Sequence, residues 1–154
     1  MRIRPFQLAD QPAVIALWSS CGLIVPRNNP VADIRRKLQV APELFLVGLL
    51  DTRLIATVMA GYEGHRGWIN YLAVAPGLRR SGHGRRIMEH AEQLLRDRGC
   101  PKINLQIRST NREVIEFYRR LGFAPDDVLS MGKRLVLDEP FPGLPVTPVR
   151  PINP

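Results

Sequence analysis

The residues best suited to chemistry in this sequence are the arginines and glycines between positions 79 and 86. Gly82 and Gly84 leave the backbone open to a ligand and permit positive φ, and a helix is predicted directly after them. The first turn of a helix presents unpaired N–H groups and the positive end of its dipole. This combination of residues is typical of a pyrophosphate-binding site. It is equally consistent with a plain helix start beside a solvated arginine cluster. The basic residues of this turn are Arg79, Arg80, Arg85 and Arg86.

Two common phosphate-binding motifs are absent from the sequence. A dinucleotide fingerprint needs a third glycine three residues after Gly84, where the chain has Ile87. A P-loop needs Gly-Lys followed by Ser or Thr, which the chain does not contain. The turn is therefore neither a dinucleotide fingerprint nor a P-loop.

The turn lies between a predicted buried strand and a predicted amphipathic helix. The apolar run 71–74 is broken by Pro76 and Gly77, and Gly99 is expected in the left-handed conformation after the helix. A strand predicted over 102–108 then forms a parallel pair with the first strand through a right-handed crossover. The apolar residues of the helix recur with the helical period and share one face: Ile87, Met88, Ala91, Leu94 and Leu95.

The remaining elements follow from periodicity and turn residues. Thr110-x-x-Glu113 is a capping box that predicts a short helix ending at Gly122. From its spacing alone, Tyr118 in this helix fits a half-buried core position better than a functional one. Strands are also predicted over 2–6, 45–50, 54–60 and 128–136, and helices over 32–40 and from a cap at Asp10 to about Gly22.

These motifs resemble the acetyl-CoA signature of the GCN5-related N-acetyltransferase (GNAT) family. The likeness covers about residues 2–135, and the stretch 61–67, GYEGHRG, resembles one bacterial branch with a GY(D/E)GHRG loop. The segments that carry the resemblance are Arg79-x-x-Gly82-x-Gly84 after Val74-x-Pro76, the later Asn111, Phe117-Tyr118 and Leu121-Gly122-Phe123, and the opening pattern at Ile3, Arg4, Pro5 and Leu17.

The resemblance implies an α/β (α+β) fold, with one mixed, strongly twisted sheet of six to seven strands and about four helices. It implies that strands 68–74 and 103–108 splay apart. The pantetheine arm of acetyl-CoA would bind there like an extra strand, and Asn111 and Tyr118 would contact the cofactor from the far side. The other implied cofactor-binding residues are Leu72, Ala73, Val74, Arg79, Arg80, Ser81, Gly82, His83 and Gly84.

The implied reaction is direct attack of a primary amine on the thioester in a ternary complex. Tyr118 would protonate the departing thiolate, and a backbone N–H near Val74 would stabilise the oxyanion. Many relatives carry a glutamate where this chain has Asn70, and an asparagine cannot take a proton. Glu63 is therefore the predicted base, with His65 or a water as alternatives. The glycine-rich loop around Glu63 fits a plain hairpin turn equally well.

The sequence leaves the acceptor open between a small-molecule amine and a peptide or protein amine. Trp18, Arg27 and Asn28 lie in the region that borders the acceptor site in the family, although a structural role is favoured for each. A homodimer is a further possibility. The replacement at Asn70 keeps open a catalytically weak acyl-CoA-binding sensor or scaffold of the same fold. The net charge of +8 keeps open a basic nucleic-acid-associated protein.

Composition and simple sequence features narrow the possible classes of function and location. Aromatic residues make up only 6% of the 154 residues, so a stacking surface for nucleic acid is not expected. No apolar run reaches about 18 residues and no signal peptide is recognised, so we expect a cytoplasmic protein with no membrane association. Cys21 and Cys100 lack metal-site spacing, and no metal is predicted. Residues 1–137 are predicted to form one domain, and 138–154 a Pro-rich tail that is extended or disordered.

Overall fold

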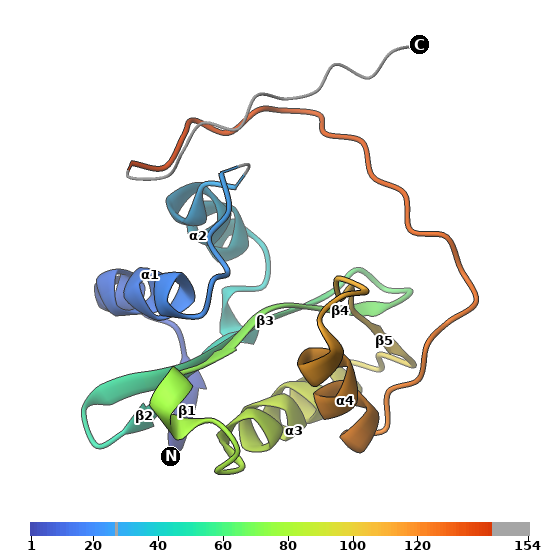
Figure 1. Cartoon of the computed structure of the whole chain (residues 1–154), viewed down its shortest axis with the longest axis horizontal. Helices are drawn as coiled ribbons and strands as arrows, with labels where there is room; N and C mark the ends of the chain where they lie inside the picture. Colours follow the sequence, from blue (N-terminus) through green and yellow to red (C-terminus); the bar gives the residue numbers. More distant parts are fainter. Residues whose placement is uncertain (27, 143–154) are drawn as a thin grey trace.

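The computed structural model describes residues 1–26 and 28–142. They form a five-stranded sheet with helices on both faces (Figure 1). Two helices cover one face, α1 (Gln11–Ser20) and α2 (Pro30–Gln39), and two cover the other, α3 (His83–Arg96) and α4 (Arg112–Arg120). Short 3-10 turns occur at Leu8–Asp10, Pro42–Leu44 and Pro76–Leu78. No helix of the described residues is both long enough and apolar enough to cross a bilayer.

The strands lie side by side in the order of the sequence. β1 to β4 pair antiparallel with their neighbours, and β5 pairs parallel with β4 through the α3 crossover, which confirms the predicted parallel pair. The strands are β1 (Arg2–Pro5), β2 (Phe45–Leu50), β3 (Arg53–Tyr62), β4 (Gly67–Val74) and β5 (Ile103–Asn104).

β4 and β5 separate soon after they meet. Their pairing is limited to Gly67 with Ile103 and Trp68 with Asn104, whereas β4 continues to Val74. The divergence expected from the family resemblance is therefore confirmed. Over 69–74, the edge of β4 that faces away from β3 has no strand partner among the described residues. This open edge is where an extended ligand could bind.

The sheet has fewer strands than the six to seven expected, because the strand predicted over 128–136 is wrong. That segment carries apolar residues at both of its ends, but it pairs with no other strand in the described part of the chain. It passes outside the β5 edge instead (Figure 1). Several of its apolar side chains are exposed as a result: Val128, Leu129, Met131, Leu135 and Val136.

Two predicted helix caps also differ from the structure. The side chain of Asn111, rather than Thr110, caps α4 by accepting a hydrogen bond from the Val114 amide at 3.3 Å. Asp10 makes no side-chain cap to α1, because its carboxylate accepts from the Gln7 amide and pairs with Arg4. The predicted left-handed glycines are confirmed at Gly99 (φ +76°) and Gly122 (φ +90°).

The core fills the space between the sheet and the two helix layers. The predicted apolar face of α3 is confirmed, since Ile87, Met88, Ala91 and Leu95 are buried. On the other face of the sheet, Trp18 of α1 stacks against Phe45. Thr57 of β3 is the only buried polar residue among those described. The predicted tail lies outside the described residues from position 143 onwards.

Candidate active site

The turn between β4 and α3 owes its shape to two residues in the left-handed region. Arg80 has φ +63° and Gly82 has φ +78°, and Gly82 is the N-cap of α3. A Cβ atom built on Gly82 would meet no atom within 4 Å. Glycine is therefore favoured at 82 by its backbone conformation and leaves open space beside the helix terminus.

A row of unpaired donors follows this turn. Among residues 1–26 and 28–142, the backbone N–H groups from Arg80 to Arg85 donate to no protein acceptor. The first bond of the helix runs from the Arg86 amide to the Gly82 carbonyl at 3.0 Å. These donors lie at the positive end of a 14-residue helix, where an anion is stabilised.

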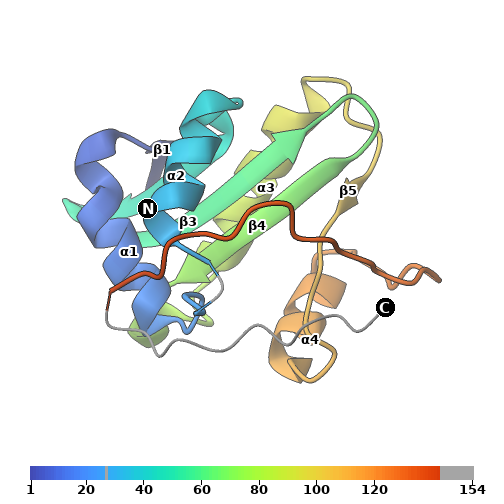
Figure 2. The same cartoon turned by 90° about the horizontal axis from the view of Figure 1, so that it is seen from above.

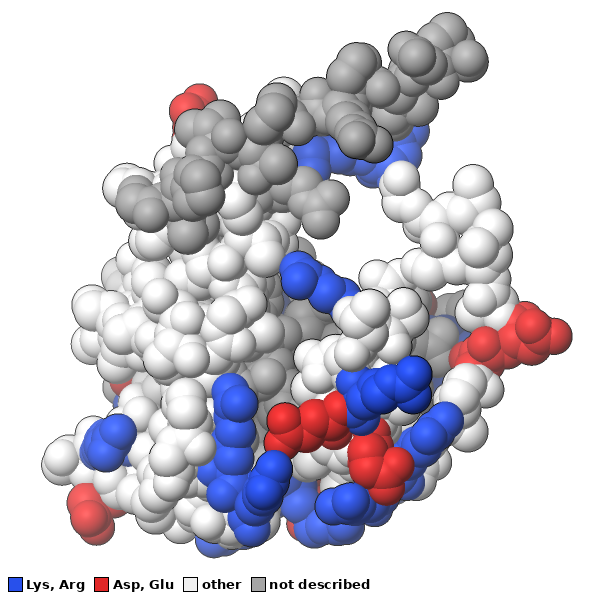
Figure 3. Space-filling view, in the orientation of Figure 1, with Lys and Arg blue, Asp and Glu red and all other residues white. Residues whose placement is uncertain are grey.

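Arginine side chains surround the same terminus. Arg80 pairs with Glu113 at 3.4 Å, and Arg85 pairs with Glu89 at 3.8 Å. Arg79 and Arg86 contact only carbonyl oxygens, those of Val74 and Met1, and form no ion pair within the described part of the chain. Figure 3 shows Lys and Arg side chains gathered over this end of the molecule. The uncompensated charge adds to the field of the helix terminus.

The residues present fit the diphosphate of a CoA-type cofactor. The free amides and arginines supply donors and charge, and the Gly82 backbone leaves room for phosphate oxygens. The Nδ1 atom of His83 is buried without a hydrogen-bond partner in the structure described, so this turn contains an unsatisfied polar atom. No group of three potential metal ligands occurs among the described residues.

Gly84 brings α4 close to this turn. A Cβ at position 84 would lie 3.2 Å from the ring of Phe117, a tight contact that would push the ring away by a few tenths of an ångström, so glycine suits this approach. The neighbouring Tyr118 is held edge-on between Phe117 and Phe123, with ring centroids 5.1 and 5.4 Å away. Its side chain is 7% exposed and lines an open cleft of about 1290 Å³ beside β5. Burial raises the pKa of its hydroxyl.

A bulge interrupts β4 in the middle of the sheet. Thr57 pairs with Ala73 and Met59 pairs with Asn70, so Tyr71 and Leu72 together lie opposite a single residue. Tyr71 has φ +51°, an uncommon conformation for a non-glycine residue. The Thr57 hydroxyl donates to the Tyr71 carbonyl at 2.9 Å and accepts from the Trp18 indole N–H at 2.9 Å. A buried hydroxyl thus holds the bulge in place.

The Tyr71 side chain lies in a second, smaller cleft of about 280 Å³ on the α1 and α2 side of the sheet. Its hydroxyl donates to Asp33 Oδ2 at 2.6 Å, and its ring stacks on Trp18 at 4.0 Å. Burial and the Asp33 carboxylate raise the pKa of Tyr71. The cleft is lined by Asn28, Asp33, Met59, Asn70 and Tyr71.

The model of the acetyltransferase (GNAT) family matches residues 10–123. The chain belongs to this family. An acetyltransferase of Yersinia enterocolitica is 43% identical over 141 residues, which cover 92% of this chain and 100% of the relative.

Two solved structures share the fold of this GNAT chain. The aminoglycoside antibiotic 6'-N-acetyltransferase of Acinetobacter haemolyticus superposes with a TM-score of 0.69 at 21% identity, covering 88% of this chain and 100% of the other. AAC(6')-Iy, in complex with a bisubstrate analogue, CoA-S-monomethyl-acetylneamine, gives a TM-score of 0.71 at 17% identity, with 86% and 97% covered.

The structure of this GNAT chain does not bring Glu63 together with Tyr118. Glu63 lies at the tip of the β3–β4 hairpin, and the turn between β4 and α3 lies at the opposite end of β4. Its carboxylate accepts from the His65 amide at 2.6 Å and the Arg66 amide at 2.9 Å. These hydrogen bonds lower the pKa of Glu63, and both observations fit a hairpin turn. The role of base remains a prediction.

Sequence reasoning missed three residues that the site depends on. Thr57, Asp33 and Tyr71 come from β3, α2 and β4, and they meet only in the folded chain. The one sequence feature that could have pointed to them is Thr57 itself, a polar residue within the apolar run of β3. Of the residues suggested for the acceptor region, Trp18 is fully buried, Asn28 lines the smaller cleft, and Arg27 lies outside the described residues.

Proposed function

We propose that this GNAT protein transfers the acetyl group of acetyl-CoA to a primary amine by direct attack in a ternary complex. The observation that carries the proposal is the row of unpaired amides from Arg80 to Arg85, which follows the end of β4 that has no pairing with β5. The amides fit the diphosphate, and the open edge of β4 fits the amide-containing pantetheine arm. One extended ligand of the CoA type satisfies both features.

Acetyl-CoA, the acetyl donor, would lie along β4 and across the N-terminus of α3. The backbone of Leu72, Ala73 and Val74 would bond the pantetheine arm. Arg79 and the turn up to Gly84, including Arg80, Ser81 and His83, would hold the diphosphate. Asn111 already caps α4 with its side-chain oxygen, which leaves its NH₂ group for the cofactor.

The acceptor would enter through the smaller cleft beside Tyr71. The β4 bulge separates that cleft from the donor edge, so the amine and the thioester would meet at this strand. Holding both in one geometry supplies a large part of the rate enhancement. A backbone N–H of the stretch 72–74 would stabilise the oxyanion of the tetrahedral intermediate.

Two proton transfers complete the reaction. Tyr118 stays protonated at neutral pH because burial raises its pKa, so it is able to donate to the leaving thiolate. The amine must lose a proton before it attacks, since a free amine has a pKa of about 10. Glu63 is the predicted base and would act through a water, because it lies at the far end of β4, and its lowered pKa makes it a weaker base than an ordinary carboxylate.

Calorimetric titration with acetyl-CoA tests the donor site. The wild-type protein is expected to bind one equivalent, and Gly82→Glu is expected to abolish binding because it places a negative side chain among the free amides. Gly99→Glu is the matched control, since Gly99 has nearly the same φ (+76°), equally open space, and lies beyond the other end of α3. Equal binding by both variants would refute the assignment.

Amine-dependent release of free thiol separates an enzyme from a CoA-binding sensor of the same fold. Asn70 in the wall of the acceptor cleft keeps that second candidate open, because a strand carboxylate is missing there. Binding of acetyl-CoA with no thiol release across a panel of amines would favour the sensor. Saturable release with any primary amine would establish the transferase.

A further inference from the structure

The chain after α4 returns to the acceptor side of the molecule. It runs round the β5 edge and crosses above the sheet to reach α2, as both views show (Figures 1 and 2). Residues 134–139 of this segment, which we call the strap, contact α2 and the connection before it. The strap and its partners are more than 100 residues apart in the sequence.

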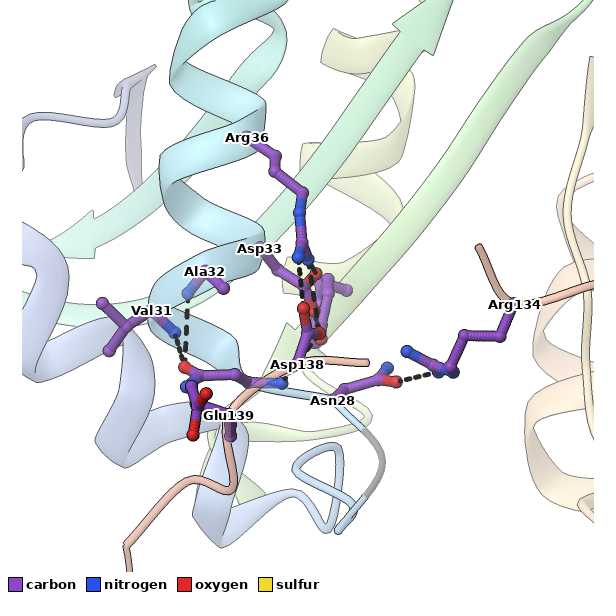
Figure 4. Close-up of polar contacts among 10 residues, drawn as sticks. Asn28, Val31, Ala32, Asp33, Arg36, Arg134, Asp138 and Glu139 are labelled. Carbon is purple, nitrogen blue, oxygen red and sulfur yellow. Dashed lines mark hydrogen bonds and ion pairs between the residues drawn. The ribbon is translucent and has the colours of Figure 1, made fainter. Parts of the chain in front are cut away.

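Three groups hold the strap in place (Figure 4). The Arg36 guanidinium forms an ion pair with Asp138. Asn29 donates its side-chain NH₂ to the Glu139 carbonyl at 3.0 Å and its amide to Asp138 at 3.4 Å. Arg134 donates to the Asn28 side chain at 3.2 Å. The residues that the strap contacts belong to the stretch 28–36, which also supplies Asn28 and Asp33 to the lining of the smaller cleft.

Asp138 is the anchor of the strap. Its side chain is 6% exposed, although most of the surrounding segment is exposed. The ion pair with Arg36 and the Asn29 amide lower the pKa of its carboxyl group, so it is charged at neutral pH. A carboxylate that is paired with Arg36 and accepts from Asn29 holds this irregular segment against α2.

The same guanidinium serves the cleft. Arg36 also donates to Asp33 Oδ1 at 3.0 Å, while Asp33 Oδ2 accepts from the Tyr71 hydroxyl. Two carboxylates therefore share one paired cation. Arg134 lowers the pKa of Asp138 at longer range, but it forms no ion pair with either carboxylate among the described residues. Among the described residues, Asp33 is the only charged one that lines the cleft.

We propose that the strap is the outer wall of the acceptor site, and that Asp33 and Asp138 there select an amine carrying a second cationic group. This proposal rests on the proposed function. A carboxylate beside the reacting amine would raise the amine's pKa and oppose attack, so the carboxylates are suited to a different ammonium on the same molecule. They would repel an acceptor that carries a carboxylate at that position.

The first test compares acceptors that differ only at the far end of the chain. The probes are 1,4-diaminobutane, butylamine and 4-aminobutanoate, with acetyl-CoA held at saturation. We expect kcat/KM to be about tenfold higher for the diamine than for butylamine, which corresponds to about 1.4 kcal/mol, and lowest for 4-aminobutanoate. Equal values for the diamine and butylamine would overturn the proposal.

Variants test the residues. Asp33→Asn and Asp138→Asn are expected to raise KM for the diamine about tenfold more than they raise KM for butylamine. Asp33→Glu, which keeps the charge, should retain the preference. Asp127→Asn is the matched control, because Asp127 is exposed and makes no polar contact within the described residues. A similar loss for both amines would show a structural role only and would overturn the proposal.

Two measurements keep this test separate from the proposed function. Thermal unfolding and calorimetric titration with acetyl-CoA show whether each variant is folded and holds the donor. If the wild type does not bind acetyl-CoA, the proposed function fails. If it binds the donor but neither amine reacts, titration of the CoA complex with 1,4-diaminobutane decides, and absence of binding that depends on Asp33 overturns the selection of a second cation.

Discussion

Single residues shape the bulge in β4, and Thr57 is the clearest case. Its hydroxyl is fully buried and links the Trp18 indole to the Tyr71 carbonyl. Both partners would be buried without a bond if the hydroxyl were removed. The left-handed Tyr71, and with it the bulge in β4, depends on this one oxygen.

Thr57→Val keeps the shape of the side chain but removes the hydroxyl. We expect a loss of about 1–3 kcal/mol in the free energy of unfolding, because a buried donor and a buried acceptor are left unsatisfied. Denaturant unfolding measures it. Thr57→Ser should recover most of the loss, and an equally unstable serine variant would assign the effect to packing instead.

Arg80 occupies a left-handed position without being a glycine. Arg80→Gly is expected to raise the free energy of unfolding by about 1 kcal/mol, because the strain at φ +63° is relieved. The same change should weaken acetyl-CoA binding, since a positive charge is lost at the phosphate site. Stability and affinity moving in the same direction would contradict this assignment.

Tyr118→Phe tests the predicted acid. Turnover should fall while the affinity for acetyl-CoA, measured by calorimetry, changes little. Because burial raises the pKa of Tyr118, its hydroxyl stays protonated up to at least about pH 10, and turnover should show no decline from its ionisation below that pH. Normal turnover in the variant would remove Tyr118 as the acid.

At the scale of elements, the link between β1 and α1 depends on one ion pair. Arg4 and Asp10 form two hydrogen bonds, at 2.7 and 2.8 Å, and Asp10 also accepts from the Gln7 amide. The Arg4 pairing lowers the pKa of Asp10 below its ordinary value of 3.8. Its stabilising effect is therefore complete above that value and is lost as the pH falls through the lower, folded-state pKa.

Asp10→Asn should lower the free energy of unfolding by about 1–2 kcal/mol at pH 7, because a charge-assisted pair is lost. The difference from wild type should shrink as the pH is lowered below about 4. Urea unfolding at a series of pH values measures it. A difference that stays constant with pH would show that the ion pair is not its source.

The elements that the sequence predicted well are those whose signal is local. In α3 the apolar residues recur with the helical period, and β2 is one continuous apolar run. Each of these elements therefore carries the signal of its own burial within its own sequence. The segment 128–136 also carries apolar residues, but it has no partner strand among the described residues, and its own residues cannot supply one. In the site, the glycine turn was predictable because it is contiguous, whereas Asp33 and Tyr71 meet only through folding.

At the scale of the whole molecule, the net charge of +8 is distributed unevenly. Lys and Arg side chains gather around the turn before α3 and around α4 (Figure 3). The smaller cleft beside Tyr71, by contrast, is lined by one carboxylate and by no basic residue among those described. The positive charge thus lies at the end for which we propose the diphosphate, and the carboxylate lies at the cleft for which we propose the amine.

Truncation distinguishes the strap from the tail beyond it. A chain ending at Glu139 keeps the Asp138 anchor and should unfold within about 2 °C of the full chain. A chain ending at Leu137 loses the anchor and should show a higher KM for the diamine with unchanged acetyl-CoA affinity. Thermal unfolding and steady-state kinetics measure both. A large loss of stability on truncation at Glu139 would show that the last residues pack on the domain.

The long reach of the strap has a consequence for the order in which the protein matures on the ribosome. The turn that fits the cofactor is complete once the residues up to α4 have been synthesised. Asn29, by contrast, can bond to Glu139 only after 110 further residues have been added. A nascent chain can therefore assemble its donor side first. The wall that we assign to the acceptor closes only once Glu139 has been synthesised, so the selectivity that we propose is acquired after the donor side has formed.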